Sequence, residues 1–468
     1  MRKETIKERI PSSFRDPSGF LFRNGETIFR QINEAYKDHF DHLIDSGLYD
    51  ALVRSKLLIP HEESDIEPVG GDAYKIIKPE RVPFISYPYE WCFSQLKDAA
   101  LTTLKIQRIA LDHGMILKDA SAYNIQFVNC KPVLIDTLSF EIYKDGEPWV
   151  AYRQFCQHFL APLALMSLKD VRLSRLLRLF IDGVPLDLAS SLLPARSRLK
   201  VGLLIHLHFH SRAQARYADK LIDKEAIKAK WMSKQALLGF VNSLESSIAQ
   251  LSWEPGGTEW GDYYGSKHNY SAEALEHKKE IVDSFIEQAK PESVWDLGAN
   301  TGLFSRLASQ RGIPTIAFDM DPAAVERNYV ECKARGRSNL LPLVLDLANP
   351  SPSIGWSCEE RMSLLDRGPA DMVLALALVH HLAISNNVPL ERIAKFFSRL
   401  CKWLVIEFIP KEDEQVQRLL AVRKDIFENY AGKSFYDNFS RHFSFTCGQE
   451  IKNSNRSLFL LKRKNEQT

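Results

Sequence analysis

A glycine-rich loop and an acid at its start carry the first sign of chemistry in the second half of the sequence. Asp296 precedes Gly298 and Gly302 in the stretch VWDLGANTG. Glycines let the backbone approach a ligand closely, and a carboxylate binds hydroxyl-bearing or positive groups. The spacing is not the dinucleotide fingerprint G-x-G-x-x-G, and no Gly-Lys-Ser/Thr follows as in a phosphate loop. Alone, this loop could be a plain turn between a strand and a helix.

Two further acids suggest that the loop is part of a site. Asp319 follows about 20 residues on in AFDMDP, and Asp346 follows in VLDL. Each acid alone could cap a turn. Each comes at the end of an apolar strand pattern, however, and parallel strands end at one edge of a sheet. The three acids together therefore indicate a binding site rather than three unrelated turns.

The elements around these acids predict the scaffold that would position them. Residues 271–290 read as an amphipathic helix, and short strand patterns then alternate with helical patterns as far as WLVIEFI. This alternation is typical of an α/β fold with a parallel sheet covered by helices on both faces. RHFSF and SLFLLKRK predict a terminal antiparallel pair.

The series of strand ends resembles the class I S-adenosylmethionine-dependent methyltransferases, over about residues 260–468. The HHL and EFIP-x-x-D patterns more narrowly resemble bacterial nodulation-type and ribosomal-protein-L11-like enzymes. The resemblance implies a Rossmann-like doubly wound seven-stranded methyltransferase sheet and S-adenosyl-L-methionine as cofactor. The implied cofactor contacts are a loop with Gly298, Asn300 and Gly302, Asp296 by the methionine part, Asp319 at the ribose hydroxyls, Met320 and Leu347 at adenine, Asp346 at the adenine amino group, and Tyr264 in a lid.

The acceptor side is expected after the fourth strand, in LVHHLAIS. An oxygen acceptor needs a base, and we expect His381, with His380 and then Glu407 as further candidates. One histidine of the pair could instead only pack or cap a helix. No Asn-Pro-Pro-Phe/Tyr motif for amide or base nitrogens is present, so a hydroxyl of a small molecule or glycan is the expected acceptor. An RNA or protein methyltransferase and a non-catalytic cofactor-binding scaffold are the rival hypotheses.

The first half predicts a different domain, of α+β type. We expect a hairpin turning at Asn24-Gly25, helices near 33–58 and 93–113, a strand in RVPFISYPY, and two short strands in NIQFV and KPVLID. The Pro and Gly residues of SWEPGGTEWG suggest a linker, which gives domains 1–250 and 251–468.

Asp119, Asn124 and Asp136 in the first half resemble the core of a protein-kinase-like fold. In that fold an Asp orients the substrate hydroxyl, an Asn binds a metal, and a later Asp binds metal on the phosphates. Leu117 stands where the family has histidine, no glycine-rich phosphate loop is present, and Arg30 could replace the usual lysine. We therefore expect a degenerate kinase-like domain that binds substrate or a partner. A bifunctional kinase and methyltransferase is the alternative.

Charge and cysteine usage exclude other classes of protein. The net charge is +2, although residues 169–234 hold 14 Lys and Arg against 6 Asp and Glu, an excess of 8 that could serve an RNA partner. The seven cysteines form no CxxC pair, which suits a reducing cytoplasm and argues against a disulfide framework or a zinc knuckle. His206, His208 and His210 in HLHFH lack companion carboxylates, so no metal site is expected. Neither a signal peptide nor a transmembrane segment is expected.

Overall fold

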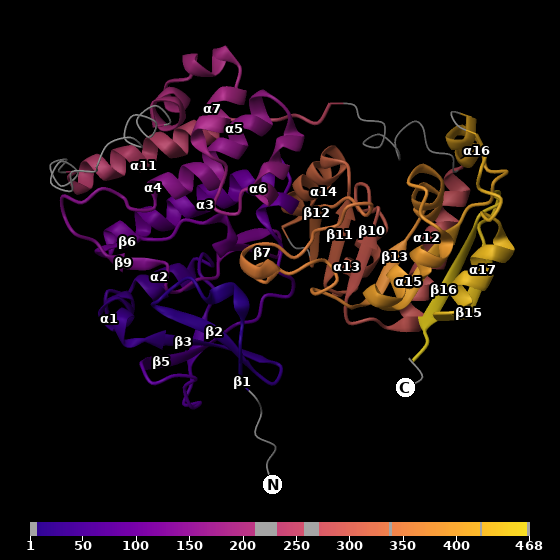
Figure 1. Ribbon diagram of the computed structural model, residues 1–468, viewed down its shortest axis with the longest axis horizontal. Coiled ribbons are helices and arrows are strands. Elements are labelled where there is room, and N and C mark those ends of the chain that lie inside the picture. Colours follow the sequence, from indigo (N-terminus) through magenta and orange to yellow (C-terminus); the bar gives the residue numbers. More distant parts are fainter. Residues whose placement is uncertain (1–6, 211–231, 257–270, 337–338, 422–423, 466–468) are drawn as a thin grey trace, which may run out of the picture. The chain divides into compact units, whose positions relative to one another are not determined.

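A computed structural model describes residues 7–210, 232–256, 271–336, 339–421 and 424–465. The chain forms two compact units, drawn in Figure 1 from indigo to yellow along the sequence. The first unit comprises Met1–Glu254 together with Ser353–Arg361, and the second comprises Pro255–Pro352 and Met362–Thr468. Among the described residues, no helix has both the length and the apolar character needed to cross a membrane.

A five-stranded antiparallel sheet opens the first unit, with strand order β1-β2-β3-β5-β4. Its strands are β1 (Lys7–Arg9), β2 (Gly19–Asn24), β3 (Thr27–Asn33), β4 (His61–Glu63) and β5 (Ala73–Pro79). Asn24 pairs with Thr27 across the β2–β3 turn, and Gly25 there has a φ of +61°, which favours glycine. The predicted hairpin is confirmed.

Helices and two small hairpin sheets make up the rest of the first unit. The strands of these sheets are β6 (Met115–Leu117) with β9 (Phe140–Ile142), and β7 (Ile125–Val128) with β8 (Lys131–Leu134). The helices are α1 (Lys37–Asp45), α2 (Leu48–Arg54), α3 (Phe93–Asp112), α4 (Tyr152–Phe155), α5 (Ala161–Leu168), α6 (Leu176–Leu179), α7 (Leu186–Leu192), α8 (Val201–Leu203) and α11 (Lys234–Ala249). The predicted strands in NIQFV and KPVLID and the helix near 93–113 are confirmed.

Two expectations for the first unit were wrong. The single helix expected over 33–58 is broken into α1 and α2 at Gly47, which has a φ of +75° that a helix cannot contain. The strand expected in RVPFISYPY is absent, and Pro88–Glu90 forms a short 3-10 helix instead. Proline donates no backbone hydrogen bond, so Pro83 and Pro88 suit this stretch poorly to a sheet.

The second unit contains a mostly parallel sheet of seven strands, in the order β12-β11-β10-β13-β14-β16-β15 (Figure 1). The strands are β10 (Val294–Leu297), β11 (Thr315–Asp319), β12 (Leu340–Val344), β13 (Ala370–Ala375), β14 (Cys401–Phe408), β15 (Phe443–Glu450) and β16 (Ser457–Arg463). The chain runs outward from β10 to β12, then returns to the other side of β10 with β13. The carboxyl ends of β10 and β13 thus flank the point where the strand order reverses, which is where such sheets bind ligands.

Helices alternate with these strands, and the mixed α/β fold expected for this half is confirmed. They are α12 (Ala272–Ala289), α13 (Ser305–Gln310), α14 (Pro322–Arg335), α15 (Leu390–Leu400), α16 (Glu414–Ala421) and α17 (Gly432–Ser440). The buried side of α12 contributes Ile281, Val282 and Phe285 to a core that includes Met372 and Leu374 of β13. The predicted terminal pair is also observed, because β15 and β16 pair antiparallel.

Candidate functional site

The glycine loop that follows β10 has a backbone that tolerates few side chains. Gly298 and Gly302 both have a φ of +79°, and Asn300 between them has a φ of +51°. A Cβ on Gly302 would lie 2.4 Å from Nδ2 of Asn328, so only glycine fits at that position. The backbone N–H of Gly298 donates to the carbonyl of Phe318 at 2.9 Å, which ties the loop to the end of β11.

Asp296 lies in β10 just before this loop and is buried. Its Oδ2 accepts a 2.6 Å hydrogen bond from the hydroxyl of Ser305 at the start of α13. Burial raises the pKa of Asp296 to about 6, and the hydrogen bond from Ser305 opposes that rise. Asp296 therefore fixes the loop against the helix that follows it.

Asp319 ends β11, and its two carboxylate oxygens accept hydrogen bonds from two loops. Oδ2 accepts from the backbone N–H of Asn300 at 2.7 Å, and Oδ1 accepts from the backbone N–H of Asp321 at 2.8 Å. Burial raises the pKa of Asp319 to about 6, while these backbone hydrogen bonds lower it. The carboxyl is thus mostly ionised at neutral pH. It is a strong acceptor at the carboxyl edge of the sheet.

Met320 and Asp346 lie beside Asp319 in the chain and in the sheet. Met320 is 56% exposed, an unusual position for an apolar side chain of this size. The backbone N–H of Leu345 donates to the carbonyl of Asp319 at 2.8 Å, which holds the end of β12, and Asp346 after it, against β11. Leu347 follows and is half-buried. The three acids predicted at strand ends therefore share one edge.

Two histidines follow β13, with ring centroids 4.1 Å apart. His380 is buried, and its Nδ1 has no hydrogen-bond partner within the described part of the chain. His381 is half-buried and begins a π-helix, His381–Ser385. Burial lowers the pKa of both imidazoles, and that of His381 falls to about 4. Both rings are neutral at physiological pH and can accept a proton.

Glu407, the third candidate base, lies in β14 and is fully buried. Its Oε2 accepts from Nζ of Lys278 at 2.7 Å and from the backbone N–H of Ala377 at 2.7 Å. Burial lowers the pKa of Lys278, while Glu407 raises it. Ala377 has a φ of +49° and lies three residues before His380, so Glu407 holds the backbone turn that leads to the histidines.

Lys278 was missed from the sequence, although a signal was present. It lies on α12 with Ala274, Ile281 and Phe285, at the three- and four-residue spacing that marks the buried side of that helix. A lysine among the inward-facing positions of an amphipathic helix needs a buried partner. That partner, Glu407, is 129 residues away in the sequence.

The first unit gathers the polar residues that the sequence singled out. Asn124 Nδ2 donates to the hydroxyl of Ser139 at 3.3 Å, and that hydroxyl donates to Oδ2 of Asp136 at 2.5 Å. Arg30 Nη1 lies 2.7 Å from Oδ1 of Asp136. Asp119 interacts with both Asp136 and Asn124. Burial raises the pKa of Asp119, the charge of Asp136 raises it further, and a hydrogen bond from Asn124 lowers it.

Ser353–Arg361, which follows β12 in the sequence, packs within the first unit. The buried carboxylate Oε1 of Glu360 accepts from Nε and Nη2 of Arg15 at 3.0 and 2.7 Å. The next residue, Arg361, places its guanidinium 4.3 Å from the ring centroid of Tyr123. We call Arg30, Asp119, Asn124 and Asp136 the polar cluster. Arg15 adjoins Asp16, whose Oδ2 lies 3.8 Å from Nη2 of Arg30, and Tyr123 adjoins Asn124. The segment therefore contacts neighbours of the polar cluster on two sides.

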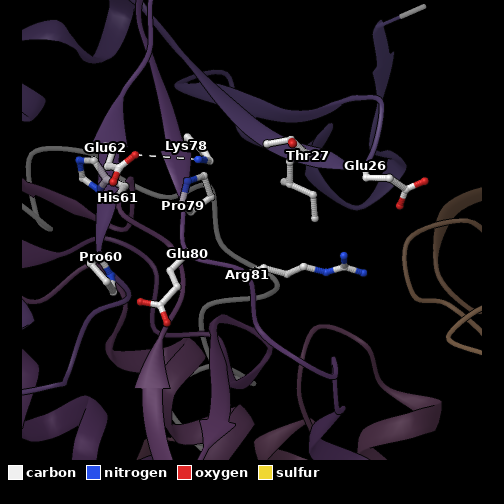
Figure 2. Close-up of a pocket in the computed structure, with 10 residues that line it drawn as sticks. Glu26, Thr27, Pro60, His61, Glu62, Lys78, Pro79, Glu80 and Arg81 are labelled. Carbon is white, nitrogen blue, oxygen red and sulfur yellow. Dashed lines mark ion pairs between the residues drawn. The ribbon is translucent and has the colours of Figure 1, made fainter. Parts of the chain in front are cut away.

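The first unit also contains an open pocket of about 440 Å³ (Figure 2). Its lining comes from the β2–β3 turn and from the segments around β4 and β5: Glu26, Thr27, Ile28, Pro60, His61, Glu62, Lys78, Pro79, Glu80 and Arg81. Glu62 and Lys78 form an ion pair of 3.9 Å on one wall, and Figure 2 shows Arg81 extending toward the side on which Glu26 and Thr27 lie. None of the residues predicted to have a role lines it.

The three histidines of HLHFH are buried or half-buried; two of them are hydrogen-bonded to hydroxyl groups, and His210 stacks on the ring of Tyr152 with centroids 4.9 Å apart. His206 contacts the hydroxyls of Tyr152 and Ser243 at 3.1 and 2.9 Å. His208 contacts the hydroxyls of Ser190 and Ser197 at 2.7 and 2.9 Å. Over the residues that the structure describes, no group of three or more His, Cys, Asp or Glu could hold a metal ion.

Two other expectations fall partly or wholly outside the described residues. Tyr264, expected in a lid, lies in 257–270. Residues 211–231 of the basic region 169–234 also lie outside the described residues. Within the described part of that region, Arg172 is paired with Asp170 at 2.6 Å.

Comparison with known proteins gives one extensive likeness. The chain is 36% identical to the nodulation protein NoeA of Rhizobium meliloti (strain 1021) over 462 residues, which cover 97% of this chain and 96% of that protein. No protein-family model matches. Two solved structures are similar to part of the chain: the PH0226 protein of Pyrococcus horikoshii OT3 (16% identity, TM-score 0.33, 45% of this chain and 100% of that one) and magnesium protoporphyrin IX methyltransferase from Synechocystis PCC 6803 with bound SAH (15% identity, TM-score 0.31, 44% and 93%).

Proposed function

The chain belongs to the family of the nodulation protein NoeA, and from that premise we propose that its second unit transfers a methyl group from S-adenosylmethionine to an acceptor. The observation that carries the proposal is the edge of the sheet where the glycine loop meets the ionised Asp319. Asn300 of the loop donates its backbone N–H to that carboxylate. A cofactor with ribose hydroxyls fits an edge that combines close backbone approach with a strong acceptor.

The residues present fit S-adenosylmethionine along its length. Asp319 would accept from the two ribose hydroxyls, and the exposed Met320 would gain an apolar partner in the adenine ring. The left-handed turns at Gly298 and Gly302 keep side chains out of the space beside the methionine part. Asp346 would accept from the adenine amino group, and the half-buried Leu347 would pack beside it.

Isothermal titration calorimetry tests whether S-adenosylmethionine is the cofactor. Titration of the purified chain with S-adenosylmethionine is expected to show one site per chain, and titration with S-adenosylhomocysteine to show the same stoichiometry. Adenosine alone should bind more weakly because the methionine part is missing. If neither compound binds to a chain shown to be folded by circular dichroism, the proposed cofactor is wrong.

We propose that the methyl acceptor is a hydroxyl group of a small molecule or glycan. When bound, the cofactor supplies an electrophilic methyl on a sulfonium, so the work of the protein is to align the acceptor and remove its proton. His381 is our proposed base, because its imidazole is neutral at physiological pH and is more accessible than that of His380. Glu407 is assigned a positioning role, because its carboxylate is occupied by Lys278 and Ala377.

His381→Ala is expected to lower methyl transfer by roughly a hundredfold or more, with affinity for S-adenosylmethionine within about twofold of wild type. The contribution of His381 requires the neutral ring, so it is present above about pH 4 and lost as the pH falls through that value. Incorporation of a labelled methyl group into extract components measures the rate, and calorimetry measures the affinity. His442→Ala, at a half-buried histidine beside β15, is the control and should change neither quantity. Unchanged transfer in His381→Ala would exclude His381 as the base.

A second function is favoured by the polar cluster of the first unit, and we propose that this unit binds a phosphate-bearing ligand in a kinase-like arrangement. The proximity of Asp119, Asn124 and Asp136 supports this proposal. Arg30 supplies a buried cation beside Asp136. Because Asp119 and Asp136 are acids and Arg30 is already paired with Asp136, a phosphate group would need a divalent cation between it and these carboxylates.

Asp136→Ala should abolish binding of ATP in the presence of magnesium, because it removes the carboxylate that would hold the magnesium ion on the phosphates. Binding of a fluorescent ATP analogue to the full chain, displaced by ATP, is the measurement. Asp145→Ala removes an exposed carboxylate elsewhere in the unit and should leave binding intact. Absence of any ATP binding by the wild-type chain would remove this second function and leave the methyltransferase proposal untouched.

A further inference from the structure

A short helical segment of the first unit points apolar side chains toward solvent. α8 runs into a π-helix, Leu204–Phe209. Val201, Ile205 and Phe209 are 68%, 43% and 49% exposed, and Leu199 just before them is 84% exposed. Residues four apart lie on the same side of such a helix. We name Leu199, Val201, Ile205 and Phe209 the apolar stripe.

The opposite side of the same segment is buried and partly polar. A Cβ on Gly202 would lie 1.9 Å from the hydroxyl oxygen of Ser247, so the segment packs against α11 as closely as backbone allows. His206 and His208 point inward and bond to hydroxyl groups through both ring nitrogens. The buried side also carries Leu203 and Leu207, so the segment has apolar side chains on both sides, and those of the apolar stripe face solvent.

The exposed stripe is meaningful because apolar groups in contact with water cost free energy. Single exposed apolar residues are common, but four within eleven residues are a local concentration, and concentrations of exposed apolar side chains mark interaction surfaces. The inward positions of the histidines show that the orientation of the segment is fixed by specific hydrogen bonds. The apolar side is thus held outward by the fold.

The charge of the segment indicates which partner fits. Residues 192–210 contain Arg196, Arg198 and Lys200 and no acidic residue. Arg196 and Arg198 are exposed, and Lys200 lies between Leu199 and Val201 of the stripe. Aliphatic side chains beside arginine and lysine are typical of segments that lie in the interface of an anionic bilayer. Single-stranded RNA would be expected to use several stacking aromatic rings, whereas three of the four stripe residues are aliphatic and Phe209 is the single aromatic one.

We propose that the apolar stripe, with its three flanking basic residues, binds the surface of an anionic lipid membrane. The aliphatic side chains enter the boundary between headgroups and acyl chains, and the basic side chains pair with the lipid phosphates. Neither step involves the methyltransferase unit or the polar cluster, so the proposal stands independently of the functions proposed above.

Vesicle flotation of the full chain tests the proposal. The wild-type chain should float with vesicles of phosphatidylcholine mixed with phosphatidylglycerol and remain unbound with phosphatidylcholine alone. The double substitution Ile205→Asn with Phe209→Ser should weaken binding at least tenfold, because it removes two inserted side chains. Arg196→Gln with Arg198→Gln should weaken it by a comparable factor, and added salt should weaken binding of the wild-type chain.

Val150→Ser is the matched control, since Val150 is 63% exposed in the same unit but lies outside the stripe. It should bind vesicles like wild type. The proposal is overturned if the wild-type chain does not float, or if the stripe variants float as well as the control. It is also overturned if the stripe variants dissociate a dimer seen by analytical ultracentrifugation, because the stripe is then a protein interface. Equal loss of RNA binding and no vesicle binding would assign the surface to nucleic acid.

Discussion

Asp319→Ala is expected to weaken binding of S-adenosylmethionine by roughly a hundredfold or more. Each hydrogen bond to an ionised carboxylate contributes about 1.5–3 kcal/mol, and the two ribose hydroxyls would both donate to this group. The substitution also removes the acceptor for the backbone N–H of Asn300, which loosens the glycine loop. Calorimetric titration with S-adenosylhomocysteine gives the affinity without turnover.

The matched control for this experiment is Asp371→Ala. Asp371 begins β13 at the amino edge of the same sheet, where it accepts from the backbone N–H of Glu292 at 2.9 Å and pairs with Lys402 at 2.5 Å. Its loss should leave cofactor affinity unchanged, since ligands bind at the opposite edge. Equal affinity in Asp319→Ala and wild type would remove Asp319 from the cofactor site.

Lys278→Met is expected to destabilise the second unit by about 3–5 kcal/mol. The substitution leaves the carboxylate of Glu407 fully buried without its 2.7 Å partner, and an unpaired buried charge is costly. Adding Glu407→Gln should restore much of the loss, because the amide oxygen can still accept from the backbone N–H of Ala377. Denaturant unfolding, followed by a probe confined to the second unit, measures the difference.

A surface ion pair provides the comparison. Arg311 pairs with Asp283 at 2.7 Å, and both side chains are more than a third exposed. Arg311→Met should therefore cost about 1 kcal/mol or less. If Lys278→Met costs no more than Arg311→Met, the buried pair does not hold the turn before the histidines.

Much of the second unit could be predicted because its information is local. Alternating strand and helix patterns determined the order of elements, and the acids at strand ends marked the edge where a ligand would lie. Asp296, Asp319 and Asp346 could be placed together because parallel strands end on one side of a sheet. The contact of Asp319 with the backbone of Asn300 was not predictable, because it depends on the positive φ values of the loop.

Features that depend on contacts between residues far apart in the sequence, or on one backbone conformation, were not predicted. Glu407 was expected to face the acceptor, but nothing in the sequence around it reveals a lysine 129 residues earlier. The break at Gly47 in the expected helix was a matter of a single backbone conformation. No local pattern indicated that Ser353–Arg361 would pack with the first unit, because its contacts are to Arg15 and Tyr123.

In the first unit, residue spacing located some of the polar contacts, whereas the positions of the histidines could not be predicted. Asp119, Asn124 and Asp136 were selected by spacing; they are near one another, and their role as a kinase-like site stays a prediction. Arg30 was suggested as a substitute for a missing lysine, and it pairs with Asp136. The histidines of HLHFH were ambiguous, because an alternating pattern places them on one side of a strand but on different sides of a helix. In the structure these histidines lie in a helical segment, and His206 and His208 are held in place by hydrogen bonds to serine hydroxyls.

The most direct test of methyl transfer follows a labelled methyl group in cells. Cells that carry the chain, the chain with Asp319→Ala, or no copy are fed methionine labelled in its methyl group, and their small molecules and glycans are compared by mass spectrometry. Methyl transfer by the second unit predicts a labelled species, heavier by one methylene unit than its precursor, that appears only with the wild-type chain. An identical set of labelled species in all three, with the wild-type chain folded and present, would contradict methyl transfer.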